Sequence, residues 1–126
     1  MIVAIVAVIT DLFFGVQVME AAKAVGKTVR FATSIDQALE LLRAEPHAEL
    51  LLADLNCRDV DTVELVRLVR ADPAVAGVPA AGFISHVQEE RKRAALAAGY
   101  GRVLARSALA THLRPLLAGA TSTTAD

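Results

Sequence analysis

The 126-residue sequence has a single cysteine, Cys57, and no apolar run long enough to cross a bilayer. One thiol excludes an internal disulfide and fits a reducing compartment, so we expect a cytoplasmic protein. Thirteen basic and fourteen acidic residues give a net charge of −1, which predicts neither nucleic acid nor a membrane as partner. The apolar opening, MIVAIVAVIT, has no basic flank and no small-residue cleavage site. We therefore interpret it as a buried strand and not as a signal peptide.

The sequence also lacks a glycine-rich phosphate loop after its first apolar run, and it lacks a cluster of cysteine and histidine. These absences argue against a phosphate-loop nucleotide site and against a structural zinc site. What the chain does have is a 55% share of hydrophobic residues, enough for one buried core at this length. We expect one domain over residues 1–118 and a disordered polar tail over residues 119–126.

Short apolar runs alternate along the whole chain with segments whose apolar residues are three or four positions apart. Strands are predicted at residues 2–9, 28–33, 50–53, 80–85 and 102–105, each followed by an apolar spacing typical of a helix. Five strand–helix units predict a three-layer α/β/α fold with a parallel five-stranded sheet, in the flavodoxin-like order 2-1-3-4-5. The first and third strand tips are neighbours in that order, so Asp11 and Asp54 should lie close together.

The most informative stretch is residues 49–69, where a buried strand ends on Asp54 and a polar loop leads to a helix. Asp61 and Glu64 have the spacing of a capping box at the start of that helix. Ligands collect at such strand tips in open α/β sheets, so Asp54 either serves a site or only caps its loop. Asp11, at the first strand tip, is equally well a metal ligand or the N-cap of the first helix.

Several short motifs follow one another at defined spacings between Asp54 and Arg106. They are Asp54-Leu55, Cys57-Arg58, Asp61-Thr62-Val63-Glu64-Leu65, Ala98-Gly99 and Arg106-Ser107. In this register the sequence resembles the receiver domains of bacterial response regulators over essentially its whole length. The resemblance implies Asp54 as phosphoryl acceptor and Asn56 as a metal ligand through its backbone carbonyl. It also implies a protein partner, which would be a histidine kinase, a phosphotransferase or an effector.

The sequence departs from the receiver pattern at the implied metal site. Ile9 and Thr10 occupy the place of the family's acidic pair, with Asp11 one position later. The implied metal ligands are therefore Asp11, Asp54 and Asn56, and we expect Mg²⁺ binding to be weak or absent.

Further departures fall on the last two strands. Ile84 stands where receivers place a hydroxyl residue, and Ser85 follows it; Val103 replaces the switch aromatic. Arg106 replaces the invariant lysine and could still clamp a phosphoryl group. Ser85 is more simply the cap of the fourth helix. These changes predict a degenerate stand-alone receiver that is not an ordinary phosphorylation switch.

Two functions of different classes stay open. The first is a signalling module and not an enzyme, phosphorylated or not, that docks a protein partner. The second is a small flavodoxin-like ligand-binding protein or enzyme that uses Asp11, Asp54, His86 and Arg106. The missing phosphate loop speaks against the second.

The end of the chain carries two more expectations. We expect no output domain after the fifth helix, so output should be a protein contact through the fourth helix, fifth strand and fifth helix. A weak homodimer is expected on the same face. Pro115 removes a backbone donor and disfavours helical geometry at Arg114. We therefore predict a kink or an end of the last helix near Arg114.

Overall fold

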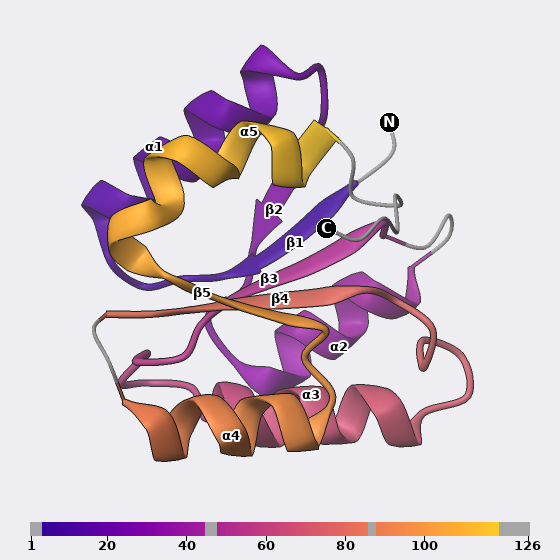
Figure 1. The fold of residues 1–126 in the computed structure, drawn as a ribbon. Helices are drawn as coiled ribbons and strands as arrows, with labels where there is room; N and C mark the ends of the chain where they lie inside the picture. The colour runs from indigo at the N-terminus through magenta and orange to yellow at the C-terminus, as the bar shows by residue number, and fades with distance from the viewer. Residues whose placement is uncertain (1–3, 45–47, 86–87, 119–126) are drawn as a thin grey trace.

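The computed structural model describes residues 4–44, 48–85 and 88–118, and within them strands and helices alternate (Figure 1). His86 and the expected tail lie outside the described residues. The strands are β1 (Ile5–Val8), β2 (Val29–Phe31), β3 (Leu50–Asp54), β4 (Ala80–Ile84) and β5 (Arg102–Ala105). The helices are α1 (Leu12–Ala24), α2 (Ile35–Arg43), α3 (Thr62–Ala71), α4 (Glu89–Ala98), the short 3-10 helix η1 (Arg106–Ala108) and α5 (Leu109–Ala118).

The sheet is parallel throughout and has the order β2-β1-β3-β4-β5. The fold class and strand order predicted from the sequence are confirmed. In the centre of the sheet Ile5 is level with Val29 on one side and with Leu50 on the other. All strands therefore end at the same edge, and the loops that follow β1, β3 and β4 meet there.

Two apolar cores lie on the two faces of the sheet. Helices α1 and α5 cover one face, and α2, α3 and α4 cover the other (Figure 1). Because side chains alternate along a strand, β3 serves both cores. Leu50 and Leu52 belong to the α1–α5 core, whereas Leu51 and Ala53 belong to the α2–α4 core. Covering on both faces explains why the central strands read as unbroken apolar runs.

Side-chain caps begin three of the helices where the sequence carries Asp or Ser. At α3, Asp61 accepts a hydrogen bond from the backbone N–H of Glu64 at 3.0 Å. Ser34 accepts one from the backbone N–H of Gln37, also at 3.0 Å. The third cap, Asp11 at α1, belongs to the candidate site.

The start of α4 differs from the sequence prediction. Its N-cap residue is Gln88, not Ser85, whose hydroxyl donates to Asn56 instead. Within α4, Ala94 is exposed, whereas Ala95 is fully buried.

The last helix continues past Pro115 to Ala118. The predicted end of the helix near Arg114 is therefore wrong, while a kink there stays a prediction. Proline removes a single helical hydrogen bond, and burial offsets that loss because Leu113, Leu116 and Leu117 on either side all pack into the α1–α5 core. Among the described residues, no helix is both long enough and apolar enough to span a membrane.

Candidate functional site

Asp54 is the last residue of β3 and lies at the carboxyl edge of the sheet, only 7% exposed. Its Oδ1 accepts a hydrogen bond from the backbone N–H of Asn56 at 2.8 Å. Its backbone carbonyl accepts from the hydroxyl of Thr62 at 3.0 Å and from the N–H of Cys57 at 3.1 Å. The side chain thus holds the turn that follows β3, and the strand tip keeps a largely buried carboxylate.

Asp11 has partners for both of its carboxylate oxygens. Oδ1 accepts from the backbone N–H groups of Phe13 and Phe14, at 3.0 and 3.2 Å, and so caps α1. Oδ2 forms an ion pair with Nη2 of Arg106 at 2.5 Å. The hydrogen bond from the N–H of Phe14, followed by that from Arg106, lowers the pKa of the Asp11 carboxyl below its ordinary value. The N-cap role left open by the sequence is the one that Asp11 fills here.

Arg106 is held by an aromatic ring as well as by Asp11. Its guanidinium lies 4.5 Å from the centroid of Phe14, a cation–π geometry. Phe14 in turn packs edge-on against Phe83, the residue level with Asp54 in the sheet, with ring centroids 4.4 Å apart. Among the described residues, no basic side chain forms an ion pair with Asp54. The cation expected beside the acceptor is therefore engaged elsewhere.

A polar network connects the loop after β3 with the segment after β4. Oδ1 of Asn56 accepts from both the backbone N–H and the hydroxyl of Ser85, at 2.8 and 2.9 Å. Nδ2 of Asn56 donates to Gln88 at 3.2 Å, and Gln88 also accepts from Nε of Arg91 at 3.0 Å. Nη1 of Arg91 donates to the carbonyl of Leu55 at 3.1 Å. The Asn56 side chain thus fixes Ser85, the hydroxyl nearest in sequence to the receiver position.

Two of these network residues were not predicted from the sequence. Gln88 and Arg91 lie at the charged start of α4, where the sequence predicts only a solvent-exposed helix surface. The spacing of three residues between them, which places both on one side of a helix, was the available signal.

The two substituted receiver positions point into the core. Ile84 is 5% exposed and belongs to the α2–α4 core, and Val103 packs against that core half-buried. At the β1 tip, the hydroxyl of Thr10 contacts Sγ of Cys57 at 3.6 Å. The residues at the positions of the second acid, the hydroxyl and the switch aromatic therefore make packing contacts and a weak thiol contact.

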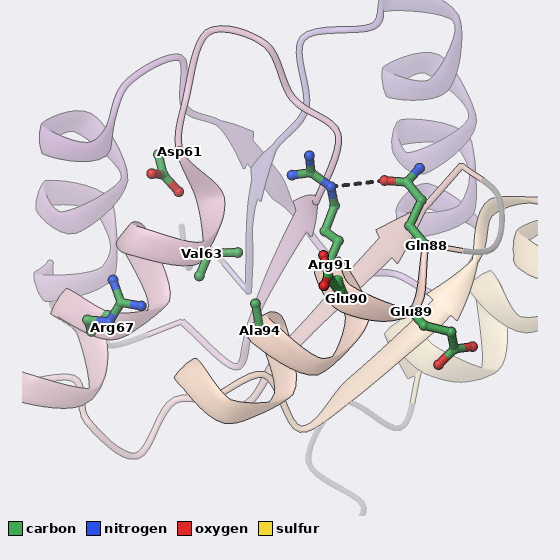
Figure 2. Close-up of a pocket in the computed structure, with 8 residues that line it drawn as sticks. All are labelled: Asp61, Val63, Arg67, Gln88, Glu89, Glu90, Arg91 and Ala94. Carbon is green, nitrogen blue, oxygen red and sulfur yellow. Dashed lines mark hydrogen bonds between the residues drawn. The ribbon is translucent and has the colours of Figure 1, made fainter.

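An open groove lies between α3 and α4, beside these loops (Figure 2). It encloses about 810 Å³, and it is lined by both acids and bases, among them Asp61, Arg67, Glu90 and Arg91. Neither Asp54, Asp11 nor Arg106 lines it. We place the candidate site at the strand tips, where the charged groups have defined partners, and not in this groove.

The carboxylates present do not fit a Mg²⁺ site as they stand. Mg²⁺ requires near-octahedral oxygen ligands and keeps several waters, so it depends on carboxylates that are free to bind it. Both oxygens of Asp11 are occupied by the α1 cap and Arg106. Within residues 4–44, 48–85 and 88–118, no group of three or more Asp, Glu, His or Cys is placed to hold a metal ion.

The strand order, the two helical layers and the acid at the β3 tip define a flavodoxin-like fold of the receiver type. Solved structures share this fold along the whole chain. Response regulator RPA3017 in red light signaling of R. palustris has a TM-score of 0.81 and 16% identity, over 98% of this chain and 97% of that one. The phosphorylated cyanobacterial phytochrome response regulator RcpA has a TM-score of 0.78 and 19% identity, over 95% of this chain and 96% of that one.

The Mn²⁺-bound form of response regulator Rcp1 has a TM-score of 0.75 and 19% identity, over 98% of this chain and 99% of that one. At these identities the likeness is one of fold. No protein-family model and no curated protein matches the sequence.

Proposed function

We propose that this chain is a receiver-type signalling module that acts by docking a protein partner, with Asp54 as the candidate phosphoryl acceptor. The partner would be a histidine kinase, a phosphotransferase or an effector. Support comes from the shared fold with response regulators over nearly the whole chain. It comes also from a buried carboxylate at the β3 tip. The partner surface proposed is the α4–β5–α5 face, where Lys92 and Arg93 are exposed.

We further infer that phosphorylation has little control over this module, and the pairing of Arg106 with Asp11 is the observation that carries this inference. Phosphorylation shifts the equilibrium between two conformations only if the phosphoryl group makes better contacts in one of them. A fixed cation that binds the phosphoryl group in that conformation would supply such a contact. Arg106 is the basic residue at the receiver's lysine position, and Asp11 and Phe14 already hold it. Recruiting it to Asp54 would break both contacts, so the phosphoryl group gains less from it.

The second support is the state of Ser85. In a switching receiver, a hydroxyl on this segment must move toward the phosphoryl group. Here both the hydroxyl and the N–H of Ser85 donate hydrogen bonds to Asn56. The preceding residue, Ile84, is buried in the α2–α4 core. Moving Ser85 would leave the side-chain carbonyl of the half-buried Asn56 without these two donors, at a cost of about 1 kcal/mol for each hydrogen bond that water does not replace.

The strand tips also offer few free ligands for a metal ion. Phosphoryl transfer to a carboxylate depends on a divalent cation that neutralises the converging charge. The chain offers Asp54 and the Asn56 carbonyl, with Asp11 available only if Arg106 and the α1 cap release it. We propose weak Mg²⁺ binding, with slow phosphorylation of Asp54 as its consequence.

Intact mass after incubation with acetyl phosphate and Mg²⁺ tests this proposal. In that reaction an oxygen of Asp54 would attack phosphorus, the bond to the acetyl oxygen would break, and acetate would leave. The wild type is compared with Asp54→Asn and with Asp59→Asn, an exposed acid in the same loop that serves as the matched control. We expect little or no adduct in all three proteins.

Partner binding gives the second readout of the same experiment. A purified histidine kinase or phosphotransferase that binds wild type and Asp54→Asn equally well would support a phosphorylation-independent module. A stable adduct that is lost only in Asp54→Asn and that changes partner affinity more than tenfold would overturn it.

A further inference from the structure

The exposed apolar side chains of this protein gather on one helix. Six large apolar side chains are exposed in the described part of the chain, and four of them lie on α1. They are Leu12 at 85%, Phe13 at 75%, Val16 at 53% and Met19 at 49%. The opposite side of α1 is buried against the sheet and α5 through Phe14, Val18, Ala21 and Ala22. Helix α1 is therefore apolar on both sides, as a helix covered on both sides would be.

The four side chains form a continuous stripe, because residues three and four positions apart lie on one side of a helix. Leu12, Val16 and Met19 have that spacing, and Phe13 flanks them. Lys23, exposed and four positions after Met19, continues the stripe with a positive charge. At the other end lies Asp11, whose side chain is 41% exposed. Asp11 is already paired with Arg106, and Glu20, also exposed on α1, lies three positions before Lys23, so the stripe is apolar at its centre and carries charges of both signs beside it.

We propose that this α1 stripe is a homodimer interface, in which two copies pack their α1 helices antiparallel about a two-fold axis near Val16. In that arrangement Val16 meets Val16 of the second copy, and Phe13 faces Met19 of the second copy. A thioether beside an aromatic ring is a favourable contact.

The area supports a second copy as the occupant. A fully exposed large side chain presents about 200 Å², so the four exposed fractions amount to roughly 500 Å² on one copy. A patch of that size lies within the range of about 300–600 Å² for the largest apolar patch on a monomer, and such patches are often functional. Two copies would bury roughly 1,000 Å², which is the lower bound for a specific interface. The dimer is therefore weak and depends on concentration, and it needs no phosphoryl group.

This interface replaces the α4–β5–α5 face as the site of the expected homodimer. On that face Leu96, 43% exposed, is the exposed large apolar residue of α4. Its neighbours Lys92 and Arg93 are exposed and of like charge, which opposes a two-fold contact. The α1 stripe leaves the α4–β5–α5 face free for the partner proposed above.

Sedimentation equilibrium of the wild type, Val16→Glu, Val16→Lys and Leu96→Glu tests the proposal. In a two-fold interface each substitution acts twice, so Val16→Glu and Val16→Lys should each raise the dissociation constant at least tenfold. An equimolar mixture of the two should associate again, since glutamate then meets lysine across the axis. Leu96→Glu should associate like the wild type. Circular dichroism checks the fold of each variant, and Phe13→Ser, at a more exposed position, repeats the test should Val16 variants fold poorly.

Three results would overturn the proposal. A wild type that is monomeric at the highest soluble concentration would leave the stripe to a different protein. A dimer that survives Val16→Glu and Phe13→Ser but dissociates in Leu96→Glu would place the interface on α4. Monomeric Val16 variants that do not associate when mixed would exclude the antiparallel pairing.

Discussion

The guanidinium of Arg106 lies 2.5 Å from the carboxylate of Asp11, and this ion pair joins residues 95 positions apart in the chain. It brings the start of α1 together with the end of β5 and leaves Asp54 without a basic partner among the described residues. The pair is partly exposed, with 32% of the Arg106 side chain accessible. Solvent therefore screens it, and its role is to position Arg106 more than to stabilise the fold.

A pair of substitutions separates the two roles of Asp11, the α1 cap and the ion pair with Arg106. Asp11→Asn keeps a side-chain oxygen that caps α1 but removes the charge that holds Arg106. Asp11→Ala removes both. An exposed ion pair contributes about 0–1 kcal/mol and an N-cap about 0.5–2 kcal/mol. We expect Asp11→Ala to lower the free energy of unfolding by about 1 kcal/mol more than Asp11→Asn does, as measured by urea denaturation. Equal losses would mean that the cap contributes nothing.

Acid should remove the ion-pair contribution. The folded-state pKa of Asp11 lies below its ordinary value of 3.8, so the charged form is favoured in the folded protein. The stability that Asp11 contributes is therefore present above pH 3.8 and is lost as the pH falls through the folded-state pKa below it. Stability curves of wild type and Asp11→Asn should converge in that acid range. A difference that stays constant across it would assign the effect to something other than ionisation.

Tyr100 gives an optical probe of the α2–α4 core, because the sequence has one tyrosine and no tryptophan. Its ring is 2% exposed and its hydroxyl donates to the carbonyl of Thr62 at 2.7 Å. Burial raises the pKa of the Tyr100 phenol above its ordinary value of 10. A raised pKa stabilises the fold fully below pH 10, and this stability is lost as the pH rises above 10.

Absorbance at the tyrosinate band should thus titrate later in the folded protein than in urea, where the pKa returns to about 10. Coincidence of the folded and urea titrations would contradict the buried hydrogen-bonded ring.

Gly82 has no room for a side chain. A Cβ there would lie 2.9 Å from Cγ of Leu55, which follows Asp54 and is itself buried. Overpacking of this kind costs about 1–3 kcal/mol, so Gly82→Ala should destabilise the protein by that amount in chemical denaturation. Gly77→Ala is the matched control, because a Cβ at Gly77 meets no atom within 4 Å. The idea fails if both substitutions have the same effect.

The sheet could be predicted from the sequence because the central strands β1, β3 and β4 are buried on both faces and so appear as continuous apolar runs. Leu50 to Ala53 is such a run, and its end at Asp54 marked the strand tip. The caps at Ser34 and Asp61 were also predictable, since they depend on residues three positions apart. These features are local in the chain.

The side-chain partners at the site were not predictable in the same way. Asp11 and Arg106 meet only because β1 and β5 end at the same edge of the sheet, and Phe14 contributes a ring that sequence spacing assigns simply to the core. Ser85 was expected to cap α4, but Asn56, brought near by the pairing of β3 with β4, offers it a better acceptor. The end of the helix predicted near Arg114 was wrong because core packing of α5 outweighs the one hydrogen bond that Pro115 removes.

We propose that the contacts of Arg106 and Ser85 uncouple this receiver fold from phosphorylation. Amide NMR spectra recorded during titration with Mg²⁺ and beryllofluoride, a phosphoryl mimic, test it most directly, with Asp54→Asn as the control. We predict that any shifts stay close to Asp54 and Asn56, and that the amides of Val103, Leu104 and the α4 helix do not move. Saturable shifts at Val103 and along α4 that disappear in Asp54→Asn would contradict the claim.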